Sequence, residues 1–146
     1  MEIVIGSDHG GYELKKYIIE NLIKDGIIVI NVGTDSEDSV DYPEYALKVT
    51  NIVKEKSILG IVICGTGIGI SIAANKVKGI RASLCHTEFE AEMTRRHNNS
   101  NILALGGRVL GKDLAYNIVK KYINTEFEGG RHQRRIDKII NIENAN

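Results

Sequence analysis

Short apolar runs alternate along this chain with longer segments in which apolar residues recur every three or four positions. The short runs have the composition of β-strands: Ile3–Ile5, Ile27–Val32, Gly60–Cys64, Ile80–Leu84 and Ile102–Leu105. The longer segments have helical spacing: 14–23, 46–53, 70–76, 88–96, about 110–123 and about 131–142. Strands that are apolar on both faces and alternate with helices predict a parallel sheet covered on both sides. We therefore expect an α/β fold, a Rossmann-like three-layer α/β/α sandwich with a parallel sheet of about five strands.

The composition indicates one domain and excludes a polyanion-binding protein. The 146 residues include a single proline, Pro43, and no linker-like stretch, so we expect one domain spanning residues 1–146. Lys plus Arg and Asp plus Glu each number 19, and aromatic residues make up 5% without any tryptophan, so we expect no nucleic-acid partner. No run approaches the ~18 apolar residues that span a bilayer, so we expect no membrane association.

The first residues and the cysteines bear on cellular location. Met1–Gly6 has none of the features of a secretory leader. The two cysteines, Cys64 and Cys85, lie far apart and outside any metal-binding spacing. We therefore expect a cytoplasmic protein with free thiols, without a disulfide or a metal ion.

Ligands of parallel α/β sheets bind where the strands end at their carboxyl edge. The third predicted strand ends at Cys64 and runs through a glycine-rich loop, 65–69, into a helix. Backbone N–H groups of such a loop and the helix dipole together form an anion site, and the same positive end stabilises a thiolate. The alternatives are a tight turn that requires glycine and a Cys64 that serves as a small buried apolar residue. Cys85 has no such loop after it, which favours the buried role.

Two histidines fall in loops where catalytic groups gather. His9 follows Asp8 after the first strand, and His97 ends a polar helix. Histidine is suited to proton transfer near neutral pH and to hydrogen bonding with phosphate, although a structural hydrogen-bonding role is the alternative for each. Nothing beside His86 indicates a catalytic partner.

A basic cluster opens the last predicted helix. Arg131 and Arg135 stand four residues apart, so they share a helix face and can grip a phosphate together. The other basic side chains of the segment are expected to point to solvent or an interface: His132 and Arg134. The alternative is a solvated face in which the arginines pair with nearby carboxylates: Glu126 and Glu128.

Together, the ordered motifs carry a resemblance that spans essentially the whole chain. The motifs are Ser7-Asp8-His9-Gly10-Gly11, Asp41-Tyr42-Pro43, Cys64-Gly65-Thr66-Gly67-Ile68-Gly69, Arg96-His97-Asn98, Gly107-Arg108-Val109 and Arg131-His132-Gln133-Arg134-Arg135. With them the chain resembles the ribose-5-phosphate isomerase B family, which also includes galactose-6-phosphate and allose-6-phosphate isomerases. The resemblance implies interconversion of ribose 5-phosphate and ribulose 5-phosphate through an enediolate, in the pentose phosphate pathway, without metal or organic cofactor.

The resemblance also implies a role for each matching residue. Cys64 matches the base that carries a proton between carbons 1 and 2, His97 matches the ring-opening acid, and Thr66 stands beside the charge of the intermediate. The matching substrate contacts are Asp8, His9, Gly65, Thr66, Gly67, Ile68, Gly69, Asn98, Arg108, Arg131 and Arg135. In the family the site is shared across a homodimer, with dimers pairing as tetramers in some members. The C-terminal helix, about 131–142, is accordingly expected to contribute to the dimer interface and the phosphate site.

Departures from the family pattern are few, and two other functions stay open. Asn99 stands where an acidic residue is common, and Ser100 where alanine is common. Relatives that lack the cysteine use a glutamate in the glycine loop, where this chain has Ile68, so the chain resembles the cysteine-base branch. The alternatives are an isomerase of a six-carbon sugar phosphate, such as allose 6-phosphate or galactose 6-phosphate, and a non-catalytic sugar-phosphate-binding module.

Overall fold

A five-stranded parallel sheet forms the centre of the molecule. A computed structural model describes all residues, Met1–Asn146. The strand order is β2-β1-β3-β5-β4, with every neighbouring pair parallel. The strands are β1 (Glu2–Ser7), β2 (Ile28–Asn31), β3 (Leu59–Cys64), β4 (Ala82–Leu84) and β5 (Ile102–Gly106). β3 and β5 are almost wholly buried, as expected of central strands covered on both faces. The predicted parallel sheet of about five strands is confirmed.

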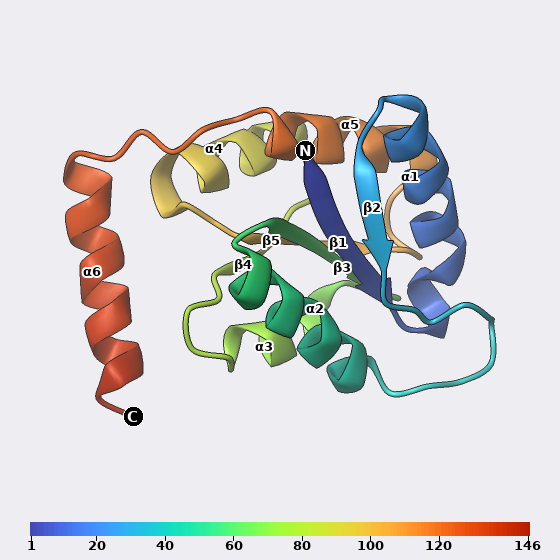
Figure 1. Cartoon of the computed structure of the whole chain (residues 1–146), viewed down its shortest axis with the longest axis horizontal. Helices are drawn as coiled ribbons and strands as arrows, with labels where there is room; N and C mark the ends of the chain where they lie inside the picture. Colours follow the sequence, from blue (N-terminus) through green and yellow to red (C-terminus); the bar gives the residue numbers. More distant parts are fainter.

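Helices cover both faces of the sheet (Figure 1). They are a short 3-10 turn, η1 (His9–Gly11), followed by α1 (Tyr12–Lys24), α2 (Tyr42–Lys56), α3 (Ile68–Asn75), α4 (Glu88–Asn98), α5 (Lys112–Ile123) and α6 (Arg131–Asn144). One apolar core joins the sheet to α1, α4 and α5, and a second joins its other face to α2 and α3. Alternate residues of each central strand divide between the cores; Ile61 faces the first and Val62 the second. The three-layer sandwich is therefore the one predicted.

Two predicted elements begin later than expected. The fourth strand starts at Ala82, because the backbone N–H of Ile80 donates to Val77 in a turn that closes α3. The fifth helix starts at Lys112, because Val109 and Leu110 both donate to the carbonyl of Gly106 in a tight turn. In both cases an apolar residue ahead of the regular element, Ile80 or Leu110, continues its hydrophobic pattern because it packs against a core from within a turn.

The last helix lies beside the sandwich instead of joining either layer (Figure 1). α6 contacts α4, and near its end the Glu143 carboxylate accepts the backbone N–H of Gly79 at 3.1 Å. A groove of about 790 Å³ separates α6 from the segment 75–83. Ile139 and Ile142 are 47% and 66% exposed. α6 therefore presents an apolar face that its own chain leaves largely uncovered.

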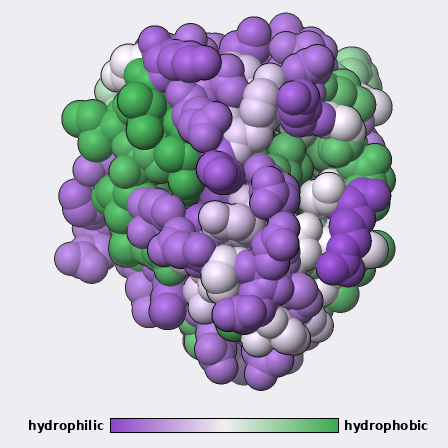
Figure 2. All heavy atoms as spheres, turned by 90° about the vertical axis from the view of Figure 1, so that its right-hand side faces the viewer, coloured by the Kyte–Doolittle hydropathy of each residue, from purple (hydrophilic) through white to green (hydrophobic).

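The side of the molecule that carries α1 and β2 is mainly hydrophilic, with apolar areas toward its margins (Figure 2). Beneath this surface Lys15 of α1 is buried, and its ammonium group donates to Asn31 at 2.8 Å and to Asp35 at 3.2 Å. Burial lowers the pKa of Lys15, an effect that the Asp35 carboxylate partly offsets. These contacts fasten the segment after β2 to the sheet. None of the helices is long and apolar enough to cross a membrane.

Candidate functional site

The glycine-rich loop places a thiol beside the first turn of α3. Cys64 is the last residue of β3, and its Sγ accepts the backbone N–H of Gly67 at 3.2 Å. Thr66 is exposed, and its hydroxyl accepts the N–H of Ile68 at 3.2 Å. The cap residue of α3, Gly67, has no side chain to occupy the N–H groups of the first turn, and of these the Ile68 N–H alone has the Thr66 hydroxyl as its partner. The loop can therefore stabilise negative charge, both on Cys64 and on a bound oxygen.

Gly67 is required by the shape of this loop. Its φ is +78°, in the left-handed region, and a Cβ there would lie 2.6 Å from Leu84 and 2.7 Å from the backbone of Leu105. A side chain at this position would both strain the backbone and push the loop away from β5. The tight turn that requires glycine, given above as an alternative, is therefore present, and the anion site stays a prediction.

Three strand-to-helix turns meet at the carboxyl edge of the sheet. The N–H of Gly107 donates to the carbonyl of Cys64 at 2.8 Å, and the N–H of Arg108 donates to Gly65 at 2.9 Å. A Cβ on Gly107 would lie 2.6 Å from the carbonyl of Gly10, so the β5 turn also packs against the β1 turn. These contacts create an open pocket of about 420 Å³ lined by His9, Gly10, Glu13, Glu37, Gly107 and Arg108.

The predicted phosphate contact His9 is held in this pocket by the segment after β2. The backbone N–H of Val40 donates to His9 Nδ1 at 3.2 Å, so Nδ1 is an acceptor and a neutral ring carries its proton on Nε2. That proton is free to be donated to an anion. Neighbouring Asp8 is buried, and its Oδ1 accepts the N–H of Gly11 at 3.2 Å. Its other carboxylate oxygen has no partner within the chain.

His97 lies at the opposite edge of the sheet from Cys64. β3 and β5 run in register, with Gly60 opposite Ile102 and Cys64 opposite Gly106. His97 is in the last turn of α4, shortly before β5 begins. At 3.3 Å of rise per residue, the strand from Gly60 to Cys64 spans about 13 Å. Within one chain, therefore, the predicted base and the predicted ring-opening acid are not brought together.

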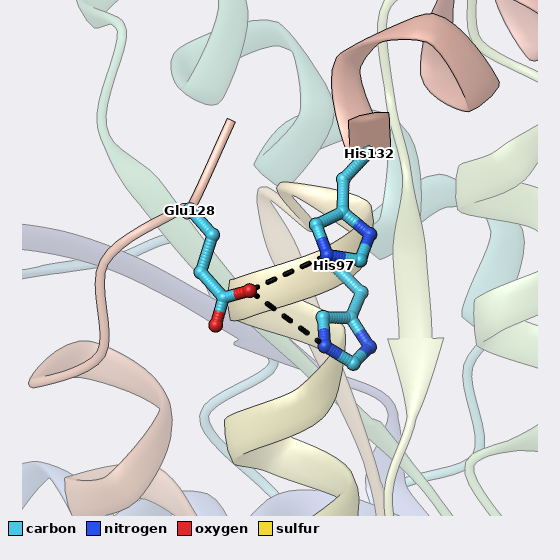
Figure 3. A group of neighbouring side chains, drawn as sticks. All are labelled: His97, Glu128 and His132. Atoms are coloured by element: carbon cyan, nitrogen blue, oxygen red, sulfur yellow. Dashed lines mark ion pairs between the residues drawn. The ribbon is translucent and has the colours of Figure 1, made fainter. Parts of the chain in front are cut away.

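His97 belongs instead to a cluster that joins α4 to α6 (Figure 3). Its ring stacks on His132, with centroids 4.2 Å apart and planes 13° apart. Glu128 Oε1 lies 3.3 Å from His132 Nε2 and 3.9 Å from His97 Nε2. The other oxygen, Oε2, accepts from Arg96 Nε at 2.5 Å. This hydrogen bond is the largest cause of a lowered pKa at Glu128.

The expectation that His132 points to solvent or an interface is wrong. The residue is 6% exposed, because the His97 ring covers one face and Glu128 covers its edge. Burial is the first cause of its lowered pKa, and the positive charges of His97 and Arg131 add to it. A neutral His132 is therefore the form that this cluster favours.

The cluster does not have the geometry of a metal site, although its three potential ligand atoms lie within 4.8 Å of one another. A metal ion must lie close to the plane of each imidazole that binds it. Because the two stacked rings are nearly parallel, their planes do not meet near Glu128. The carboxylate also has Arg96 on its second oxygen. We interpret the cluster as a polar network built around the Arg96–Glu128 ion pair.

The two predicted phosphate-binding arginines of α6 carry no partner within the chain. Arg131 and Arg135 are exposed and four residues apart on the helix. The alternative in which they pair with Glu126 and Glu128 is wrong, because Glu128 pairs with Arg96 and the two histidines, and Glu126 makes no ion pair. Asn98, also exposed, lies at the groove beside α6. The guanidinium groups are thus open to an external anion.

The two cysteines differ in surroundings, as the sequence indicates. Cys85 is 2% exposed in the first core, and burial raises the pKa of its thiol to about 12. Cys64 is also buried, 5% exposed and part of the second core, but its Sγ accepts the backbone N–H of Gly67. The motif Asp41-Tyr42-Pro43 was singled out in the sequence without a role for Tyr42. A Cβ on Gly69 would lie 2.6 Å from the Tyr42 ring, so the ring covers the loop, a contact that the residues around Tyr42 do not signal.

The chain is similar to known proteins over its full length. Residues 3–139 match the Ribose/Galactose Isomerase family. Ribose-5-phosphate isomerase B of Escherichia coli is 47% identical, over 97% of this chain and 96% of that protein.

Two solved structures extend the comparison to the fold. The structure of Clostridium thermocellum ribose-5-phosphate isomerase B is 56% identical, covers 99% of both chains and superposes with a TM-score of 0.97. Ribose-5-phosphate isomerase B of Mycoplasma genitalium, solved with bound ribulose 5-phosphate, is 44% identical and has a TM-score of 0.94, over 99% of this chain and 97% of that one. The chain belongs to the ribose/galactose isomerase family.

Proposed function

We propose that this protein interconverts D-ribose 5-phosphate and D-ribulose 5-phosphate through an enediolate. The observation that carries the proposal is the full-length similarity to ribose-5-phosphate isomerases B, including one solved with bound ribulose 5-phosphate. The loop at Cys64 supports it, because the thiol lies within hydrogen-bond distance of a backbone N–H at the N-terminus of α3, where no side chain caps the helix. An aldose–ketose isomerase needs that pairing of a base with donors for an oxyanion.

Cys64 is the base of the proposed reaction. As a thiolate it removes the hydrogen from C1 of the ketose or C2 of the aldose, and it returns the proton to the other carbon. The Gly67 N–H at 3.2 Å stabilises the thiolate form. The remaining N–H groups of the 65–69 loop, with Thr66 beside them, stabilise the oxygens of the enediolate.

His97 opens the furanose ring, and polar groups from both edges hold the substrate. Ring opening needs a proton delivered to the ring oxygen and a proton removed from the C1 hydroxyl, which histidine can accomplish near neutral pH. The proposed contacts with the sugar are Asp8 and Asn98, and the proposed contacts with the phosphate are His9, Arg108, Arg131 and Arg135. The reaction requires neither metal nor organic cofactor.

The proposed active site is assembled from two chains of a homodimer. The length of β3 supports this: Cys64 lies at its carboxyl end and His97 near the opposite edge of the sheet, about 13 Å away along the strand. At that separation the two side chains of one chain do not reach the same sugar. The uncovered apolar residues of α6, Ile139 and Ile142, support a second chain as its neighbour. A reduced cytoplasm, where Cys64 stays a free thiol, is the proposed location.

A comparison of substrates tests the proposed reaction. The purified protein is assayed on ribose 5-phosphate, allose 6-phosphate and galactose 6-phosphate, and we expect the highest kcat/KM on ribose 5-phosphate. A much higher value on a six-carbon substrate would replace the proposed substrate with that one. Binding of all three without any turnover would instead indicate a sugar-phosphate-binding module.

Mixing two inactive variants tests the shared site. We expect Cys64→Ala and His97→Ala chains to be nearly inactive alone and to regain activity when mixed and allowed to exchange subunits. Random pairing gives one intact site in each mixed dimer, so recovery approaches about a quarter of wild-type activity. No recovery, with mixed dimers present by native mass spectrometry, would place both residues in one chain's site.

A further inference from the structure

We propose that Glu128 is the residue that positions His97 for ring opening, with His132 as the surface on which the His97 ring rests. This inference rests on the proposed function, because it assigns a step of that reaction. It concerns the polar network around the Arg96–Glu128 ion pair, between α4 and α6, whose members other than His97 received no role above. Glu128 does not touch substrate in this proposal; it acts through His97.

Glu128 is fixed to the end of α4 by its backbone and by its side chain. Its N–H donates to the carbonyl of Arg96 at 3.1 Å, and its Oε2 accepts from Arg96 Nε at 2.5 Å. Oε1 is therefore held where it faces the Nε2 atoms of both histidines. Because two hydrogen bonds hold this carboxylate in place, it can fix the orientation of the imidazole beside it.

His132 fixes the plane of the His97 ring. It is buried while His97 is 40% exposed, so one ring is set by packing and the other by stacking on it. Burial lowers the pKa of His132, which favours a neutral ring and limits the repulsion that two stacked imidazolium ions would suffer. The part of the His97 side chain that is not covered by the cluster is open to solvent, since the side chain is 40% exposed.

Orientation matters for the step assigned to His97. In ring opening the bond between C1 and the ring oxygen O4 breaks, O4 gains a proton, and the C1 hydroxyl loses one as the aldehyde forms. A histidine transfers protons only along the in-plane direction of a ring nitrogen, so a ring free to turn donates less often. The acyclic ketose has no ring to open, so proton transfer at its C1 requires Cys64 and the loop but not an oriented His97.

The experiment compares these two processes in the same variants. The first is kcat for ribose 5-phosphate, and the second is exchange of the C1 hydrogens of ribulose 5-phosphate with D₂O, followed by NMR. We expect Glu128→Gln, which keeps the shape and removes the charge, to lower kcat about 10- to 100-fold and to leave exchange within about twofold. Glu126→Gln is the matched control; Glu126 is exposed and unpaired two residues away, and both rates should stay at the wild-type level.

Other outcomes would overturn the positioning role. Equal loss of both rates, or a raised KM for both substrates, would show that Glu128 merely holds α6 and its phosphate-binding arginines in place. Unchanged rates would remove Glu128 from the reaction. Loss of wild-type turnover on EDTA treatment, restored by Zn²⁺, would make the cluster a metal site. If the wild-type protein neither isomerises ribose 5-phosphate nor exchanges the C1 hydrogens of ribulose 5-phosphate, the proposed function itself is wrong. This outcome is distinct from failure of the positioning role, which leaves the wild-type protein active.

Discussion

The region at the carboxyl edge of the sheet is held together mainly by backbone groups, whereas the region at the end of α4 is held together by side chains. The first region consists of three turns joined by N–H to carbonyl hydrogen bonds, with glycines at the points of contact. The second consists of Arg96, His97, Glu128 and His132, drawn together from α4, from α6 and from the segment that precedes α6. The first region therefore depends on glycines whose added Cβ atoms would meet neighbouring backbone. The second depends on the charges of Arg96 and Glu128 and on the stacking of two rings.

The largest effect should come from the proposed base in the backbone-built region, Cys64. We expect Cys64→Ala to lower kcat by about 10³- to 10⁴-fold while binding of a sugar phosphate persists, because the oxyanion donors remain without the base. Steady-state kinetics and phosphate-ligand titration measure both effects. Cys85→Ala is the control, since its thiol is buried and protonated, and it should keep near-normal kcat.

An added methyl group tests the backbone-built region next. Gly67→Ala places a Cβ 2.6 Å from Leu84 at a φ of +78°, so we expect a loss of roughly 2–4 kcal/mol in the free energy of unfolding. Urea denaturation measures it. Gly111→Ala is matched, because φ there is −67° and nothing lies within 4 Å of the added atom. Equal stability of the two variants would contradict the packing described for the loop.

Removal of an α6 arginine should have an intermediate effect. We expect Arg135→Ala to raise KM for ribose 5-phosphate about 10- to 100-fold with a smaller change in kcat, because a charge-assisted contact with phosphate is worth roughly 1.5–3 kcal/mol. Arg134→Ala, on the same helix and also exposed, is the control. An unchanged KM in the Arg135 variant would exclude that residue from the phosphate site.

The smallest effect should be a pH dependence of stability in the side-chain region. Burial lowers the pKa of His132 from 6.5, so the unfolded chain binds more protons than the folded one as pH falls through that value. The Arg96 hydrogen bond lowers the pKa of Glu128 from 4.5, which destabilises the fold further as pH drops below it. Stability should therefore decline from pH 7.5 to pH 4 in denaturation experiments. The decline should be less steep around pH 6 in His132→Asn; an identical slope would remove His132 as its source.

The backbone-built region was predictable because its signals are local. An apolar run followed by residues 65–69 encodes strand, loop and helix within a few positions, and the sheet then brings the strand ends together. His132 could not be placed in this way. Its burial depends on its contact with His97 and on the position of α6, which the segment after α5 determines. The residues next to His132 in the sequence predict neither. The turns before β4 and α5 were misread for a related reason, since their apolar residues continue the pattern of the adjoining element.

The separate position of α6 has a consequence for how activity depends on amount. If α6 completes the active site of a neighbouring chain, the dimer is active and the separated chain is not. Specific activity would then be constant at high protein concentration and would fall in proportion to concentration once dilution exceeds the dissociation constant of the pair. Dilution alone would therefore lower the specific activity. In a cell, total activity would rise more steeply than protein concentration while that concentration is below the dissociation constant.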